Sequence, residues 1–73
     1  MAQQTLGERR VRVSFNPSGN GTVNHIKRMS ADLIDLCEEL KVDSETARLV
    51  ALAQTHYENA AMWAVKAATA QTP

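Results

Sequence analysis

Aromatic residues are scarce in this sequence of 73 residues, where Phe15, Tyr57 and Trp63 make up 4% of the chain. A chain this short buries a modest fraction of its surface, and the alanines that fill its second half add little buried area each. Stability of an isolated copy is therefore expected to be marginal. We expect a homo-oligomer in which neighbouring subunits supply the missing core.

The sequence contains one cysteine, Cys37, so no disulfide can form within the chain. This usage fits a reducing compartment. No apolar run approaches the roughly 20 residues that a membrane span needs. The first residues also lack the apolar core of a signal peptide. We therefore expect a soluble cytoplasmic protein, with Cys37 as a small core residue on an apolar helix face instead of a reactive thiol.

The net charge is zero at pH 7, which argues against a general DNA coat. The charge is uneven, however. Residues 1–28 carry five basic residues against one acidic residue, whereas residues 29–58 carry two against seven. A basic end opposite an acidic end suits a localised anionic ligand.

Patterns that carry catalysis or metal binding are missing. His25 and His56 are the only histidines, and no Cys/His cluster has metal-ligand spacing. No serine lies in a nucleophile elbow. The paired acids near residues 32–39 are better explained as a solvated helix face. We expect neither an enzyme nor a bound cofactor or metal.

The sequence pattern predicts little helix in the N-terminal third of the chain. Residues 1–7 are polar and unpatterned, and we expect a mobile tail there. Residues 8–15 alternate, with Val11, Val13 and Phe15 on one side, which is the period of an extended segment or short strand. Such a segment must lie against helices or pair with a symmetry mate. Pro17 ends it, because the residue before proline avoids the α region.

Two long helices follow. The first is expected to run to about Leu40, after a turn in which Ser18, Asn20 and Thr22 are each plausible N-caps. The second spans about Ser44 to Ala70, capped by Asp43 or Ser44. The short link makes the helices antiparallel neighbours. The sequence thus predicts one all-α domain over residues 8–73, an antiparallel two-helix hairpin with a short extended N-terminal segment, assembling into a helical homo-oligomer.

Each predicted helix has an apolar face. On the first helix this face comprises Ile26, Met29, Leu33, Leu36, Cys37 and Leu40. On the second, the apolar arc is broader than one partner helix can cover. The surplus, which includes Leu49, Leu52, His56 and Trp63, is interpreted as a subunit interface.

Several groups that bind anions gather where the first helix begins. The helix start offers free N–H groups and its positive dipole end, and the glycines at 19 and 21 allow a nest of backbone donors. Hydroxyls come from Ser18, Thr22 and Thr69, charge from Lys27 and Lys66, and a flat stacking surface from Phe15. The turn matches no phosphate-loop or dinucleotide fingerprint. A plain helix-capping turn beside a solvent lysine therefore stays open as the alternative. Lys66 points away from the Tyr57 stripe on a helical wheel, which favours a site shared between subunits.

Two stretches carry a resemblance to a known family. They are ERRVRVSFNPSG (residues 8–19), followed by Val23 and Ile26-Lys27, and THYENAAMWAVKAAT (residues 55–69). Together they resemble the helical-hairpin domain of phage anti-defence sponge proteins, which counter the bacterial CBASS and Thoeris systems. The resemblance covers about residues 8 to 70, and the AMWAVKAAT run is its most specific part.

The resemblance implies a hexamer in the cytoplasm of an infected bacterial host. It implies that cyclic dinucleotides and trinucleotides bind in pockets between subunits and are not hydrolysed. Phe15 matches an aromatic residue that stacks on the base, in a position where some relatives have tyrosine. Asn16 matches a polar residue beside it, and Lys27 a lysine that packs on the ligand. Lys66 and Thr69 lie where a basic residue and a hydroxyl contact phosphates.

This chain lacks the β-rich extra region of the family members that bind cyclic ADP-ribose variants, which favours cyclic oligonucleotides as ligands. Two other functions stay open. The chain could form a structural or protein-interaction oligomer of a phage or prophage. It could also bind nucleic acid through Arg9, Arg10 and Arg12, but zero net charge and the lack of an aromatic-rich platform argue against this.

Overall fold

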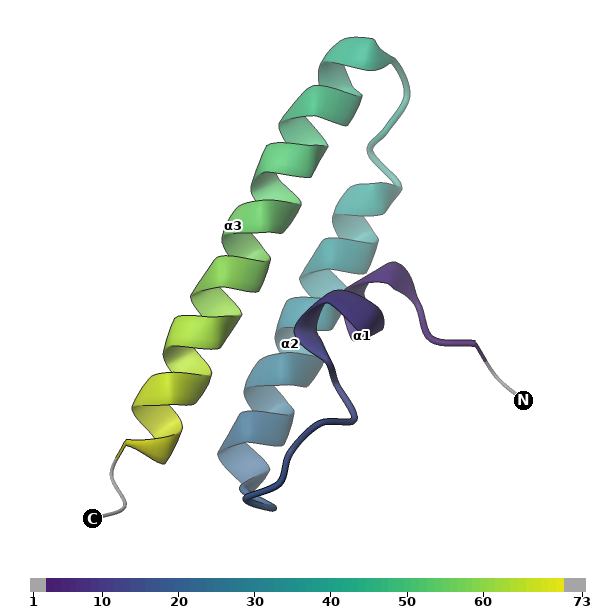
Figure 1. Ribbon diagram of the computed structural model, residues 1–73. Coiled ribbons are helices and arrows are strands. Elements are labelled where there is room, and N and C mark those ends of the chain that lie inside the picture. The colour runs from purple at the N-terminus through teal and green to yellow at the C-terminus, as the bar shows by residue number, and fades with distance from the viewer. Residues whose placement is uncertain (1–2, 71–73) are drawn as a thin grey trace.

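The computed structural model describes residues 3–70 as three helices: α1 (Leu6–Val11), α2 (Gly21–Glu38) and α3 (Ser44–Thr69). The helices α2 and α3 run antiparallel side by side, and the short α1 crosses one face of this hairpin (Figure 1). The all-helical hairpin predicted from the sequence is confirmed. Residues 1–2 of the predicted tail and residues 71–73 of the predicted domain lie outside the described part of the chain.

The N-terminal segment differs from the sequence prediction. Residues 6–11 form a helix, and no strand occurs among residues 3–70. Thr5 caps this helix in a capping box: its hydroxyl accepts a bond from the Glu8 N–H (3.1 Å), and the Glu8 carboxylate accepts one from the Thr5 N–H (2.8 Å). The prediction of an extended segment over residues 8–15 is therefore wrong, and Thr5, Leu6 and Gly7 of the predicted tail form the cap and the first two residues of α1.

Asp35 of α2 anchors the start of α1. Its carboxylate accepts a bond from the Thr5 hydroxyl (2.7 Å) and another from the Gly7 N–H (2.8 Å). Gly7 is buried where α1 crosses α2, directly against the backbone of Ala31. A six-residue helix is too short to be stable alone, so these contacts with α2 explain why α1 forms.

Side-chain caps fix the ends of the hairpin helices. Asn20 is the residue that caps α2, because its side-chain oxygen accepts bonds from the N–H groups of Thr22 (2.8 Å) and Val23 (3.2 Å). Asp43 caps α3 by accepting from the Thr46 N–H (2.8 Å). The helix α2 ends at Glu38, short of the predicted Leu40.

The core is small and lies where the three helices meet. Its buried members are Val11, Ala31, Ile34 and Ala61, with Leu6, Val13, Ile26 and Tyr57 packed around them. Gln54 lies in the α2–α3 seam at 1% exposure. Its amide nitrogen donates to the Ile34 carbonyl (3.0 Å) and to the Glu38 carboxylate (2.8 Å). This buried polar side chain is therefore hydrogen-bonded, and it links α3 to α2.

The apolar face predicted on the first hairpin helix is not the seam between α2 and α3. The residues of α2 that are buried are Val23, Lys27, Ala31 and Ile34, whereas Met29, Leu33, Leu36 and Leu40 are exposed. Cys37 is half-buried, so its predicted core position is not observed. We call the exposed apolar residues of α2 (Met29, Leu33 and Leu36), together with Leu40 just beyond its end, the back face.

The back face lies opposite α1. The contacts of α1 with α2 involve Arg28, Ala31 and Asp35, and with 3.6 residues per turn the apolar row falls on the other side of α2. The chain is only 12 Å deep along its shortest axis. Because α1 covers the other side of α2, the back face stays exposed. Within residues 3–70, no helix has the length and apolarity that crossing a membrane requires.

Candidate functional site

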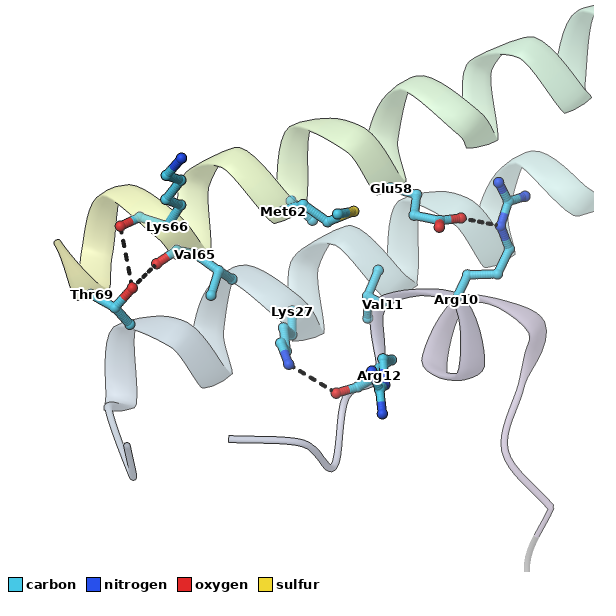
Figure 2. A pocket seen from close by; sticks show the side chains of 10 residues that line it. Arg10, Val11, Arg12, Lys27, Glu58, Met62, Val65, Lys66 and Thr69 are labelled. Atoms are coloured by element: carbon cyan, nitrogen blue, oxygen red, sulfur yellow. Dashed lines mark hydrogen bonds and ion pairs between the residues drawn. The ribbon is translucent and has the colours of Figure 1, made fainter. Parts of the chain in front are cut away.

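A groove of about 490 Å³ runs between the end of α1, the start of α2 and the C-terminal half of α3 (Figure 2). Its volume lies within the range of small-molecule sites. Val11, Ala61, Met62 and Val65 supply an apolar surface, and four basic side chains surround it against one acid. The full lining is Arg10, Val11, Arg12, Lys27, Glu58, Ala61, Met62, Val65, Lys66 and Thr69.

Arg10 and Glu58 close one end of the groove. The Arg10 Nε lies 2.6 Å from the Glu58 Oε1, and the Arg10 Nη2 lies 3.5 Å from the Thr55 hydroxyl. Both side chains are largely shielded, so this pair ties α1 to α3. The charge of Arg10 is thereby neutralised, which leaves it poorly suited to attract an anion.

Lys27 is buried in the groove wall at 7% exposure. Its ammonium donates to the Arg12 carbonyl (3.0 Å) and to the Phe15 carbonyl. It also lies 5.4 Å from the centroid of the Phe15 ring. Burial lowers the pKa of Lys27 from its usual value, and the nearby Arg12 charge lowers it further. The family resemblance implies that Lys27 packs on a ligand, which stays a prediction; in this structure its ammonium bonds to the loop after α1.

Arg12 ends α1 in a left-handed conformation, with φ of 57°. Its N–H bonds to the Arg9 carbonyl (3.3 Å), and its guanidinium lies 4.8 Å from the centroid of the Phe15 ring. The side chain is exposed. The sequence indicated Arg12 only as one of three candidate nucleic-acid contacts, since a left-handed arginine has no sequence signature.

Phe15 lies beside the groove, in a shallow pocket of about 260 Å³ formed with Gln4, Arg9, Arg12 and Ser14. Phe15 is 54% exposed, so part of its side chain is accessible to a ligand. Arg12 lines both this pocket and the groove. The arginine therefore joins the aromatic surface to the cationic groove.

Asn16 and Ser18 are absent from the lining of the groove and bond within their own turn. The Asn16 amide donates to the Asn20 carbonyl (2.8 Å) and to the Asn24 side-chain oxygen (2.9 Å). The Ser18 hydroxyl donates to the Asn16 Oδ1 (2.8 Å). These contacts shape the start of α2, as a helix-capping turn would.

Lys66 and Thr69 line the groove from α3, on the same chain as Lys27. The Thr69 hydroxyl donates back to the carbonyls of Val65 (2.9 Å) and Lys66 (3.2 Å). The Lys66 ammonium lies 5.2 Å from the Trp63 ring, and Figure 2 shows it extending away from Lys27. The expectation that Lys66 contributes to a binding site shared with a neighbouring subunit stays a prediction.

The fold and the groove define a small helical hairpin suited to an anionic ligand with an apolar or aromatic part. In residues 3–70 no group of three or more His, Cys, Asp or Glu side chains is placed to hold a metal ion. Residues 7–69 match the family described as "Acb2/Tad1, hairpin domain". The chain belongs to this family of anti-CBASS and anti-Thoeris sponges, which confirms the resemblance seen in the sequence. Neither a search of curated proteins nor a search of solved structures found a match.

The family is associated with sequestering cyclic nucleotide signals and is not known for catalysis. A cyclic oligonucleotide combines phosphates with flat bases, and the site offers cations beside an exposed aromatic ring. The chemistry of the groove thus agrees with the ligand class of the family.

Proposed function

We propose that this protein binds cyclic dinucleotides or trinucleotides that act as immune signals, and holds them uncleaved. Sequestering the signal would keep a CBASS-type effector inactive in the cytoplasm of an infected bacterial host. The observation that carries this proposal, beside family membership, is the cation-lined groove joined through Arg12 to the Phe15 ring. DNA is not an expected partner, since the net charge of the chain is zero.

Binding without cleavage is supported by how the polar groups of the groove are engaged. Its single carboxylate, Glu58, is paired with Arg10 at 2.6 Å. The Thr69 hydroxyl is bonded to the α3 backbone. Neither group is positioned beside a partner that would activate it as a base or a nucleophile.

We also propose that the protein works as a homo-oligomer, a hexamer by analogy with the resemblance, assembled through the back face. The chain exposes 5302 Å², whereas a compact monomer of its mass exposes about 4,450 Å². The excess of roughly 850 Å² is close to the area that each partner contributes to a standard protein interface. Burying Leu33 and Leu36 of one copy against another would remove this apolar surface from water.

A thermal-shift panel of cyclic nucleotides, combined with native mass measurement, tests the proposal. A ligand at about 100 times its Kd stabilises by roughly 2.7 kcal/mol, which raises the Tm of a chain of this size by roughly 10–20 °C. Phe15→Ala and Lys66→Glu are expected to reduce this shift. Lys41→Glu makes the same charge change at the link between α2 and α3, far from the groove, and is expected to leave the shift intact. No shift with any cyclic nucleotide would contradict the proposal.

The second candidate function is a protein-interaction oligomer of a phage. The exposed side chains of Met62 and Trp63, at 64% and 62% exposure, favour it because large apolar residues mark interaction surfaces. A pull-down that recovers one stoichiometric host protein, together with no nucleotide effect, would support this second function over the first.

A further inference from the structure

Of the four basic side chains that line the groove, two are bonded within the fold, and two have no carboxylate partner among residues 3–70. Arg10 is paired with Glu58 at 2.6 Å. The Lys27 ammonium donates hydrogen bonds to two backbone carbonyls. Lys66 has no carboxylate partner, but its side chain extends away from Lys27 and its ammonium lies 5.2 Å from the Trp63 ring.

Arg12 is the unpaired cation that lies beside the Phe15 ring. Over residues 3–70, the carboxylates within 4.0 Å of a basic side chain contact Arg10, Arg28, Lys41 and Arg48, and none contacts Arg12. Its guanidinium is exposed and lines both the groove and the Phe15 pocket. An unpaired guanidinium keeps its full charge and its forked donors for a phosphate.

The backbone of Arg12 supplies an independent observation. It is the sole residue other than glycine with positive φ in the described part of the chain, and it caps α1 where glycine is the favoured residue. A side chain in this conformation carries an energetic cost that folding alone does not require. Lys27 holds the Arg12 carbonyl at 3.0 Å, and the Phe15 ring supports the guanidinium at 4.8 Å. The local structure thus fixes an arginine in place where a glycine would fold more readily.

We propose that Arg12 is the residue that binds a phosphate of the ligand, with the adjoining base placed on or beside the Phe15 ring. This inference rests on the proposed function and names the cation through which that site recognises its ligand. Arginine is suited to this role because it contacts a phosphate through two parallel N–H groups and also stacks on an aromatic ring. The ligand class it requires is a phosphodiester attached to a base.

Isothermal titration of the full-length protein with a cyclic dinucleotide that the thermal-shift panel identifies tests this inference. Arg12→Gln removes the charge and is expected to weaken binding by about 10- to 100-fold, the loss expected for one charge-assisted hydrogen-bonded contact. Binding by this variant should also depend less on salt concentration than binding by the wild type. Arg12→Asn repeats the test with a residue that tolerates the left-handed backbone, so a folded variant is available if the glutamine variant fails to fold.

Arg48→Gln is the matched control, because it removes the same charge from an exposed position near the opposite end of α3, where Arg48 is paired with Glu45. It is expected to bind like the wild type. If both Arg12 variants fold and bind as tightly as Arg48→Gln, the inference is overturned while the proposed function stands. If the wild type binds no cyclic nucleotide, the proposed function fails and the inference fails with it.

Discussion

Replacing Gly7 by alanine is expected to dislodge α1 from α2. A Cβ atom at this position would overlap the Ala31 carbonyl oxygen and would lie 2.8 Å from the Ala31 carbonyl carbon and 2.9 Å from its Cα. These are backbone atoms inside a continuous helix, so they cannot rotate away as a side chain can. The whole of α1 must move instead, and the 2.8 Å bond from the Gly7 N–H to Asp35 would be stretched.

The size of the effect follows from two opposing terms. Overpacking of a tight contact costs about 1–3 kcal/mol or more, while alanine gains about 1 kcal/mol in helix propensity over glycine. Because both sides of this contact are backbone, we expect a net loss of about 2 kcal/mol in the free energy of unfolding. A domain of this size has a total stability of only about 4–11 kcal/mol, and the Tm should fall by roughly 8–16 °C.

The assay is thermal unfolding followed by circular dichroism at one fixed protein concentration, since stability of an oligomer depends on concentration. Gly21→Ala is the control, because nothing lies within 4 Å of a Cβ placed there and the residue begins α2. It is expected to be neutral or slightly stabilising. If Gly7→Ala melted at or above the wild-type temperature, the close crossing of α1 and α2 would be refuted. A displaced α1 would also move Arg12, so weaker nucleotide binding should accompany the loss of stability.

Three further perturbations test the contacts that hold the fold. Asp35→Ala should lower the free energy of unfolding by about 2–3 kcal/mol, because two hydrogen bonds to its carboxylate are lost. The control Asp32→Ala, at a side chain that is 65% exposed, should cost less than about 1 kcal/mol. Equal losses in the two variants would contradict the role of Asp35 in anchoring α1. Gln54→Met should lower the free energy of unfolding, measured in urea, by about 1–3 kcal/mol, since it removes both hydrogen bonds of a side chain that is 1% exposed. An unchanged urea midpoint would contradict the claim that Gln54 stabilises the packing of α2 on α3. Bonding to Arg28 lowers the pKa of Glu8 below its usual 4.5, and bonding to Gln54 does the same for Glu38. Their contribution is therefore present above about pH 4.5 and lost as the pH falls through the lower folded-state values. The Tm should drop on acidification from pH 5 to pH 3, and a constant Tm would refute these pKa shifts.

The hairpin could be predicted because its signals are local. Apolar residues recur every three or four positions, and the short link that ends at Asp43 forces the helices to pack antiparallel. The α1 helix could not be predicted in the same way. Its residues alternate like a strand, and its capping box at Thr5 and Glu8 is visible in the sequence but spans only a few residues. Its stability depends on Asp35, which lies 28 residues after Gly7.

The candidate site was predicted only in part for a related reason. The groove does contain Lys27, Lys66 and Thr69, which the sequence and the family resemblance indicated. Asn16 and Ser18 are engaged in their own turn, because polar residues that cap a helix look the same in sequence as polar residues that bind a ligand. The special position of Arg12 depends on a tertiary contact with Lys27 and on a positive φ. Neither of these can be read from residue type or spacing.

The most direct test of the central claim is to saturate the protein with a cyclic dinucleotide or trinucleotide, remove unbound ligand, denature the complex and identify the released nucleotide by mass. The account predicts that the nucleotide is retained through the removal step and is recovered intact and cyclic in fixed proportion to protomers. Recovery of linear products, or retention of no cyclic nucleotide by a folded protein, would contradict it.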